Sequence, residues 1–185
     1  MSDYKQRQFY LKDGRQGILR SARPSDANST LDLYRSVVEE GQYTLLQPDE
    51  LKRSRAQEED NIRSEMLAPN KLRLVAEVDE DVVGMARVSG GELVRTAHFG
   101  EIDSVWIRAT MRRQGVGRAL MTALEQWSRD DAQLEKLGLY VFSSNEGAIQ
   151  LYTRMGFEIE GRCPQDIKFG PDLYTDTIVM GKILN

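Results

Sequence analysis

The stretch that decides the fold is Arg112-Arg113-Gln114-Gly115-Val116-Gly117-Arg118-Ala119-Leu120. It follows an alternating run over residues 101–108, which predicts a strand, and it opens a segment with helical periodicity over residues 118–128. The first N–H groups of a helix have no intrahelical partner, and the helix dipole favours negative charge at that end. Gly115 and Gly117 remove the Cβ atoms that would keep a diphosphate away from the backbone. We interpret residues 112–118 as an anion-binding turn, called the cradle below.

The charges around the cradle agree with this interpretation. Residues 108–118 contain four arginines and no acid, in a chain whose formal net charge is −4. Two familiar phosphate-binding motifs do not fit. A P-loop needs G-x-x-x-x-G-K-[S/T], and the stretch has neither that spacing nor a lysine. A dinucleotide fingerprint needs G-x-G-x-x-G, and Leu120 stands where its third glycine should be.

Composition narrows the class of protein. A chain of 185 residues with 40% hydrophobic and 29% charged residues predicts a single globular domain over residues 16–185, after a flexible segment over residues 1–15. One cysteine and one histidine exclude a disulfide framework and a His/Cys zinc site, so we expect no metal. A pI near 5.2 argues against nucleic acid as a partner. We see no signal peptide and no apolar run of about 18 residues, so we expect a cytoplasmic location and no membrane partner.

The remaining elements alternate along the chain. We expect helices near residues 24–41, 48–67, 118–128 and 146–156, and strands over residues 17–22, 72–78, 82–88, 101–108, 137–142, 157–160 and 176–180. The short turn at residues 79–81 predicts an antiparallel hairpin. A right-handed crossover should place strand 137–142 parallel to strand 101–108. The order predicts an α/β (α+β) fold with a mixed sheet of about seven strands.

A second motif lies downstream of the cradle. Residues 145–157 follow the pattern N-x-x-A-x-x-L-Y-x-x-x-G-F. Together with Arg112-x-x-Gly115-x-Gly117 and the order of elements, it resembles the GNAT superfamily of N-acetyltransferases, which use acetyl-coenzyme A. The resemblance extends from about Ile18 to Leu184. It implies a mostly antiparallel seven-stranded sheet with a central splayed pair of parallel strands, flanked by about four helices.

The resemblance also implies how acetyl-coenzyme A is bound as co-substrate. In the family the two parallel strands part, and the pantetheine arm fills the gap as a pseudo-strand. Backbone groups of Val105, Trp106 and Ile107 would then bond the acetyl and pantetheine groups, while we expect the Trp106 ring to pack into the core. Asn145 would cap the following helix and bond the pantetheine amides. The pyrophosphate would lie on the cradle residues Arg112, Arg113, Gln114, Gly115, Val116, Gly117 and Arg118.

Transfer to an amine also needs a proton acceptor, because an alkyl amine with a pKa of about 10.4 does not attack while it is protonated. Glu101 is the first candidate, since some family members carry a catalytic glutamate 14 residues before the first glycine of the cradle. Asp103 shares its face of the strand and stays a second candidate. His98 or a water relay is a third. Other branches of the family place the base where this chain has Tyr140, a departure that weakens that assignment.

Tyr152 matches the family tyrosine that protonates the coenzyme A thiolate. The leading hypothesis is therefore direct attack of a small-molecule primary amine on acetyl-coenzyme A in a ternary complex. A covalent route through Cys163 is disfavoured, because Cys163-Pro164 lies after both motifs at a strand edge or bulge. The alternatives are a protein or peptide N-terminal or lysine acetyltransferase, and a non-catalytic acyl-coenzyme A sensor. A homodimer stays open, by analogy with family members.

Overall fold

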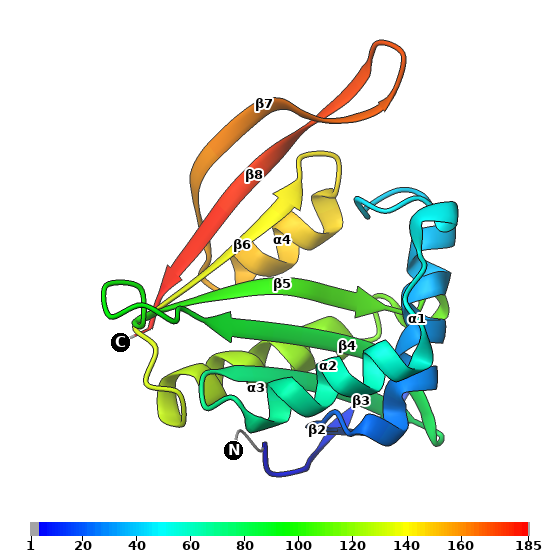
Figure 1. Ribbon diagram of the computed structural model, residues 1–185, viewed down its shortest axis with the longest axis vertical. Coiled ribbons are helices and arrows are strands. Elements are labelled where there is room, and N and C mark those ends of the chain that lie inside the picture. The colour runs from blue at the N-terminus through cyan, green and yellow to red at the C-terminus, as the bar shows by residue number, and fades with distance from the viewer. Residues whose placement is uncertain (1–3, 185) are drawn as a thin grey trace.

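The structure is a computed structural model that describes residues 4–184. Within this range the chain forms one eight-stranded sheet in the order β1-β2-β3-β4-β5-β6-β8-β7 (Figure 1). Only β5 and β6 run parallel, and every other neighbouring pair is antiparallel. The mixed, mostly antiparallel sheet was predicted correctly, but it has one strand more than expected. The strands are β1 (Arg7–Tyr10), β2 (Gln16–Ser21), β3 (Lys71–Val78), β4 (Asp81–Gly90), β5 (Phe99–Ile107), β6 (Lys136–Phe142), β7 (Glu158–Gly170) and β8 (Leu173–Ile183).

The additional strand is β1, which the sequence analysis did not predict. It pairs antiparallel with β2 at the edge of the sheet. The Phe9 ring lies over Gly17, where a Cβ atom would come within 2.4 Å of it. A glycine at that position therefore lets β1 close onto β2. Whether residues 1–15 move in solution stays a prediction, and residues 1–3 lie outside the described residues.

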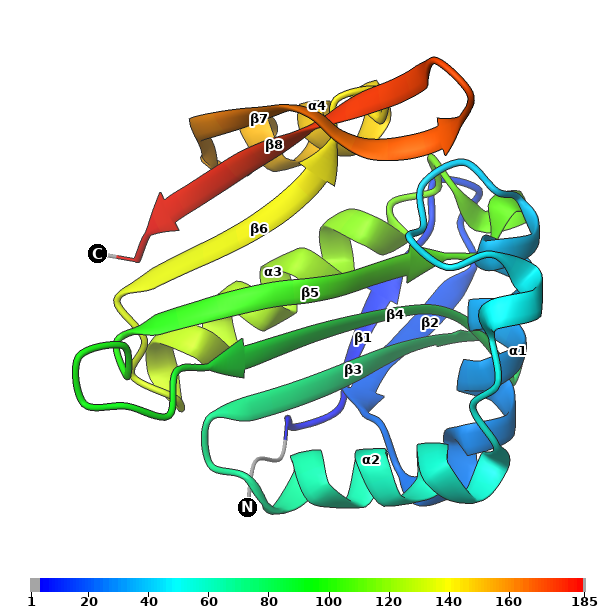
Figure 2. The same cartoon turned by 45° about the horizontal axis from the view of Figure 1, so that its top comes forward.

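Helices cover both faces of the sheet (Figure 2). They are α1 (Ala27–Glu39), α2 (Arg55–Leu67), α3 (Val116–Asp130) and α4 (Glu146–Arg154). On one face α1 and α2 enclose a small cluster that contains Leu33, Ile62 and Met85. On the other face α3 and α4 pack onto the larger core, which includes Leu124 and Trp127. The two faces of β5 therefore look into different environments.

The start of α2 differs from the prediction. We expected the helix to begin near Pro48, but Pro48–Glu50 forms only a short 3-10 turn, η2. The α-helix begins after Ser54, whose hydroxyl accepts from the Gln57 N–H while the Gln57 side chain accepts from the Ser54 N–H. This capping box satisfies two free donors at once and marks the N-terminus of α2.

The last two strands are much longer than the segments 157–160 and 176–180 that we expected. They form a hairpin that extends beyond the rest of the sheet (Figure 1). The register between β7 and β8 shifts three times, and one shift lies between Cys163 and Ile167. Such bulges interrupt the alternation of apolar and polar residues, so the pattern of β7 does not resemble a single strand.

Candidate active site

The parallel strands β5 and β6 pair over only four residue pairs. The first is Phe99 with Lys136 and the last is Ile102 with Leu139. Beyond this point β5 continues along β4 and β6 continues along β8, and Figure 2 shows the two strands diverging. Among residues 4–184 no strand pairs with the sides that face each other. Alternate residues of β5 therefore present unpaired N–H and C=O groups along this edge.

A β-bulge marks the point where the strands part. Arg87 of β4 faces Ser104, whereas the next residue, Val88, faces Ile102. Asp103 is thus left without a cross-strand partner. Bulges re-aim side chains and are frequent next to active sites. This one places a carboxylate at the end of the paired stretch.

The two candidate carboxylates on β5 have different partners. Ile102 packs into the larger core, so strand alternation puts Glu101 on the opposite face, toward the α1 and α2 side. Asp103 points to the same side, because its Oδ1 accepts from Arg87 Nε at 2.6 Å. The Glu101 side chain has no ion pair or hydrogen bond within residues 4–184. Of the two, only Glu101 is free to accept a proton without first losing a cation.

His98 and Tyr140 lie less favourably than these carboxylates. The backbone oxygen of His98 accepts from the N–H groups of Glu135 and Lys136, at the paired end of β5 and β6. At about 3.3 Å per residue, His98 is about 13 Å from Ile102 along the strand. Tyr140 follows the last parallel pair, but it is 62% exposed.

The cradle forms the N-terminus of α3. Gly115 is the residue before the helix, no side chain caps that end within residues 4–184, and the first helical bond runs from Ala119 N to Gly115 O at 3.0 Å. The N–H groups of residues 116–118 are therefore available to an outside acceptor. The carbonyl of Gln114 accepts from Lys12 N at 3.1 Å, which fixes the turn against the β1–β2 connection.

The two glycines of the cradle are needed for different reasons. Gly115 has φ +100°, in the left-handed region that favours glycine. A Cβ atom there would meet only the Tyr10 carbonyl, at 4.0 Å. A Cβ atom at Gly117 would lie 3.3 Å from Leu151 Cδ2 and 4.0 Å from Ile107 side-chain atoms. Gly117 thus lets β5, α3 and α4 meet at the cradle.

The arginines of the cradle do not all carry a free charge. Arg112 bonds Glu40 through both terminal nitrogens, at 2.6 and 2.7 Å. Its Nε also donates to the Ile107 carbonyl at 3.3 Å. Arg113 and Arg118 are exposed and form no ion pair within residues 4–184. The available side-chain charge at the cradle therefore comes from these two residues.

Helix α4 carries the other two predicted site residues. Asn145 Oδ1 accepts from Ala148 N at 3.2 Å, so Asn145 caps the helix as predicted and keeps its amide NH₂ free. Tyr152 is 7% exposed, and its ring centroid lies 6.0 Å from that of Phe157. Burial raises the pKa of Tyr152 to about 12. Its hydroxyl has no hydrogen-bond partner in the described part of the chain.

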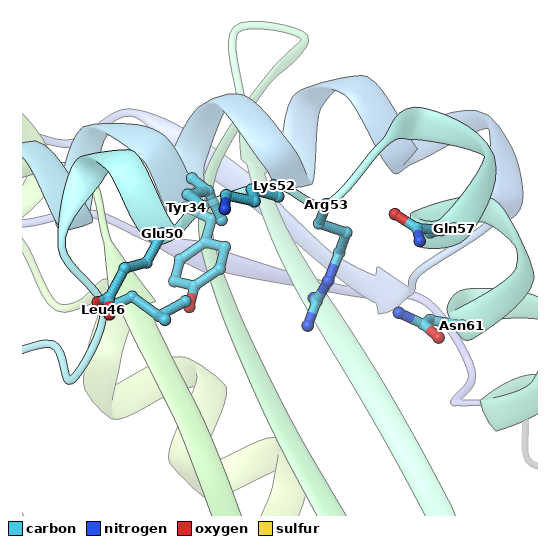
Figure 3. A pocket seen from close by; sticks show the side chains of 8 residues that line it. Tyr34, Leu46, Glu50, Lys52, Arg53, Gln57 and Asn61 are labelled. Atoms are coloured by element: carbon cyan, nitrogen blue, oxygen red, sulfur yellow. The ribbon is translucent and has the colours of Figure 1, made fainter.

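Trp106 connects β5 to a pocket on the other face. Its ring stacks on Tyr34 of α1, with centroids 4.0 Å apart and an interplanar angle of 2°. The ring therefore packs within the protein, as expected. Because Arg108 N donates to Val83 O, the register directs the Trp106 backbone toward Met85 of β4, while Val105 and Ile107 face the unpaired edge. Tyr34 in turn lines a pocket of about 440 Å³ (Figure 3). The pocket is lined by Tyr34, Leu46, Glu50, Leu51, Lys52, Arg53, Gln57 and Asn61.

A chain of buried charges runs from this pocket to the bulge. Glu58 and Glu65 of α2 are almost fully buried and pair with arginines from the strands. This network was not predicted from the sequence. A signal was present, because two arginines interrupt the apolar runs of β3 and β4. In order, the network consists of Arg53, Glu58, Arg73, Glu65, Arg87 and Asp103.

Comparison with known proteins agrees with this geometry. The model of the acetyltransferase (GNAT) family matches residues 38–157. An L-amino acid N-acetyltransferase from Escherichia coli is 33% identical over 108 residues, which are 55% of this chain and 64% of that protein. A GNAT acetyltransferase from Streptococcus pneumoniae has a TM-score of 0.85 at 24% identity, covering 90% of this chain and 99% of that one. The yncA protein of Salmonella typhimurium, solved with acetyl-CoA, has a TM-score of 0.79 at 21% identity, covering 90% and 93%.

The family model covers well over half of the chain, so the protein belongs to the acetyltransferase (GNAT) family. The match to the E. coli relative spans slightly less than two thirds of that relative's length. No helix among residues 4–184 is long and apolar enough to cross a membrane.

Proposed function

We propose that this protein transfers the acetyl group of acetyl-coenzyme A to a primary amine of a small molecule, by direct attack in a ternary complex. The observation that carries the proposal is the unpaired edge of β5, which runs from the bulge at Asp103 to the uncapped N-terminus of α3. The alternate residues Val105 and Ile107 face that edge with their backbone groups, whereas the backbone of Trp106 between them pairs with β4. Family membership supports the reaction class.

The cradle residues fit the diphosphate of the carrier. The N–H groups of residues 116–118 have no acceptor in the described chain, and the exposed Arg113 and Arg118 add positive charge. The free amide NH₂ of Asn145 is a donor for a pantetheine carbonyl. Bound acetyl-coenzyme A would supply an activated acetyl group.

Glu101 is the proposed base for the incoming amine. It stands beside the bulge, and its carboxylate is not held by a cation within residues 4–184. Asp103, by contrast, is bonded to Arg87 and serves to hold the bulge. A proton released by the amine would pass to the Glu101 carboxylate directly or through one water.

Tyr152 is the proposed donor to the departing thiolate. Because its pKa is about 12, the phenol is fully protonated at neutral pH. Complete transfer to a thiolate whose thiol has a pKa of about 8.5 would be uphill by about 5 kcal/mol. We therefore assign Tyr152 a hydrogen bond that stabilises the thiolate charge, with solvent completing the protonation.

The pocket beside Tyr34 is the proposed acceptor site. Its volume of about 440 Å³ lies in the range of small-molecule sites. Tyr34 lines the pocket and its ring stacks on that of Trp106, which belongs to the strand with the unpaired edge. A pocket of this volume can hold a small amine.

Two measurements test the proposal. Calorimetry should detect binding of coenzyme A, and a free-thiol assay with acetyl-coenzyme A should find turnover with amines from a panel of amino acids, polyamines, aminoglycosides and peptides. Tyr152→Phe should lower kcat tenfold or more while coenzyme A still binds. Binding without turnover on any acceptor would favour the sensor alternative, and no binding at all would refute the proposal.

A further inference from the structure

The acceptor pocket contains two cationic side chains that the reaction itself does not require. Lys52 and Arg53 both line it, at the end of the segment that leads into α2. Lys52 forms no ion pair within residues 4–184. The pocket's one acid, Glu50, is engaged by the backbone, because its Oε2 accepts from Gln47 N at 2.9 Å. Glu50 keeps its negative charge, so with Lys52 and Arg53 the charged side chains that line the pocket carry a formal charge of about +1.

Arg53 has donors to spare. Among the contacts of residues 4–184, only its Nη1 is used, donating to Glu58 Oε2 at 3.0 Å, and a guanidinium carries five N–H donors. Glu58 does not depend on this bond alone, because its other oxygen is bonded by Arg73 and by Thr30. The Arg53 side chain is 35% exposed, so its remaining donors can reach a molecule in the pocket.

The position of Arg53 relative to β5 sets the orientation of an acceptor. Its guanidinium carbon lies 5.9 Å from the Tyr34 ring centroid, and Figure 3 shows the side chain extending beside that ring. Tyr34 stacks on Trp106 of β5. A molecule that spans the Tyr34 ring would thus have one end at Arg53 and the other toward the strand where acetyl transfer is proposed.

We propose that Arg53 binds a carboxylate of the acceptor, so that the substrate is a small primary amine that also carries a carboxylate. This inference rests on the proposed function and specifies its acceptor. A guanidinium matches a carboxylate with two parallel hydrogen bonds. Polyamines and aminoglycosides lack that group and would place further cations beside Arg53 and Lys52. Lys52 adds a second, more mobile charge at the same end.

The test pairs substrates with variants. Aliphatic amino acids with one to five carbons between amine and carboxylate are compared with their amides, in wild type, Arg53→Gln, Arg53→Lys and the control Arg55→Gln. Arg55 is two positions further along the chain, at the start of α2, and does not line the pocket. A charge-assisted hydrogen bond should give wild type about a 10- to 100-fold higher kcat/KM for the best acid than for its amide. Arg53→Gln should abolish that preference by slowing the acid alone, Arg53→Lys should restore part of it, and Arg55→Gln should retain it.

If Arg53 had a purely structural role, Arg53→Gln would lower kcat/KM for the acid and for its amide equally, and that result would overturn the inference. Equal use of acid and amide by wild type also overturns it, while leaving the proposed acetyl transfer intact. If no amine is acetylated, the acids are titrated into the coenzyme A-loaded protein by calorimetry. Heat that is present in wild type and lost in Arg53→Gln supports the carboxylate site even then, and no heat refutes it.

Discussion

Arg112 and Glu40 form a two-bond ion pair that joins the end of α1 to the cradle, with Nη1–Oε2 and Nη2–Oε1 distances of 2.6 and 2.7 Å. The first arginine of the cradle motif is therefore neutralised by a carboxylate from another element. The motif therefore makes two separate contributions, one from its backbone and one from the Arg112 side chain. The backbone provides the anion site, and Arg112 fastens it to α1.

Replacing either partner of this ion pair by a neutral residue should change coenzyme A binding, and the two changes should have opposite signs. Glu40→Gln frees Arg112 for the diphosphate and should tighten binding about threefold, whereas Arg112→Gln leaves a carboxylate near the cradle and should weaken it by a similar factor, as for partly exposed pairs. Calorimetry at low salt measures both, and 1 M salt should reduce both effects. Arg35→Gln, on the exposed side of α1, is the control. Equal weakening by both variants would mean that the pair acts only as a brace.

Glu101 and Asp103 should differ in their effect on turnover at neutral pH. If Glu101 accepts the amine proton, Glu101→Gln should lower kcat/KM by about 10²–10⁴-fold. Asp103→Asn should lower it much less, because Asp103 is bonded to Arg87. A large loss in Asp103→Asn but not in Glu101→Gln would reverse the assignment.

Tyr152 should contribute to stability in a defined alkaline window. Its pKa rises from 10.0 to about 12 on folding, so the unfolded chain loses this proton first. The contribution is fully present below pH 10, falls as pH rises through the window, and is lost by about pH 12. It amounts to about 3 kcal/mol. Urea unfolding from pH 9 to 11.5 should therefore show a steeper fall for wild type than for Tyr152→Phe, and parallel curves would contradict this.

The buried arginine of the network should be hard to remove. Arg73→Met leaves Glu58 and Glu65 facing each other without their shared cation, although Arg53 and Arg87 remain. Breaking a buried pair in this way typically costs about 3–5 kcal/mol. Urea unfolding at pH 7 measures the loss. Arg63→Met, which removes an exposed pair with Asp60, should change stability by less than about 1 kcal/mol.

Local signals were sufficient for most of the sheet. The hairpin β3–β4 and the unit from β5 through α3 to β6 follow from apolar runs, a short polar turn and a glycine turn, and these occur where expected. The edge strand β1 and the length of β7–β8 depend on pairing across the sheet and on bulges. The residue pattern within one segment does not contain that information.

The site was predicted only in part for a similar reason. The motifs identified the backbone donors of the cradle and the cap at Asn145, whose geometry is local. The bond of Arg112 to Glu40 and the stack of Trp106 on Tyr34 join residues about 70 positions apart, and spacing does not reveal them. Arg73 and Arg87 could have been noticed as charges inside buried strands, although their partners on α2 could not.

The short seam between β5 and β6 has a mechanical consequence. In the described part of the chain, five strands on one side of the seam and three on the other are joined within the sheet by four residue pairs. A ligand that hydrogen-bonds along both diverging edges would act as a replacement strand and stiffen the junction. Amide protons of β6 beyond Leu139 should then exchange more slowly with deuterium when coenzyme A is present.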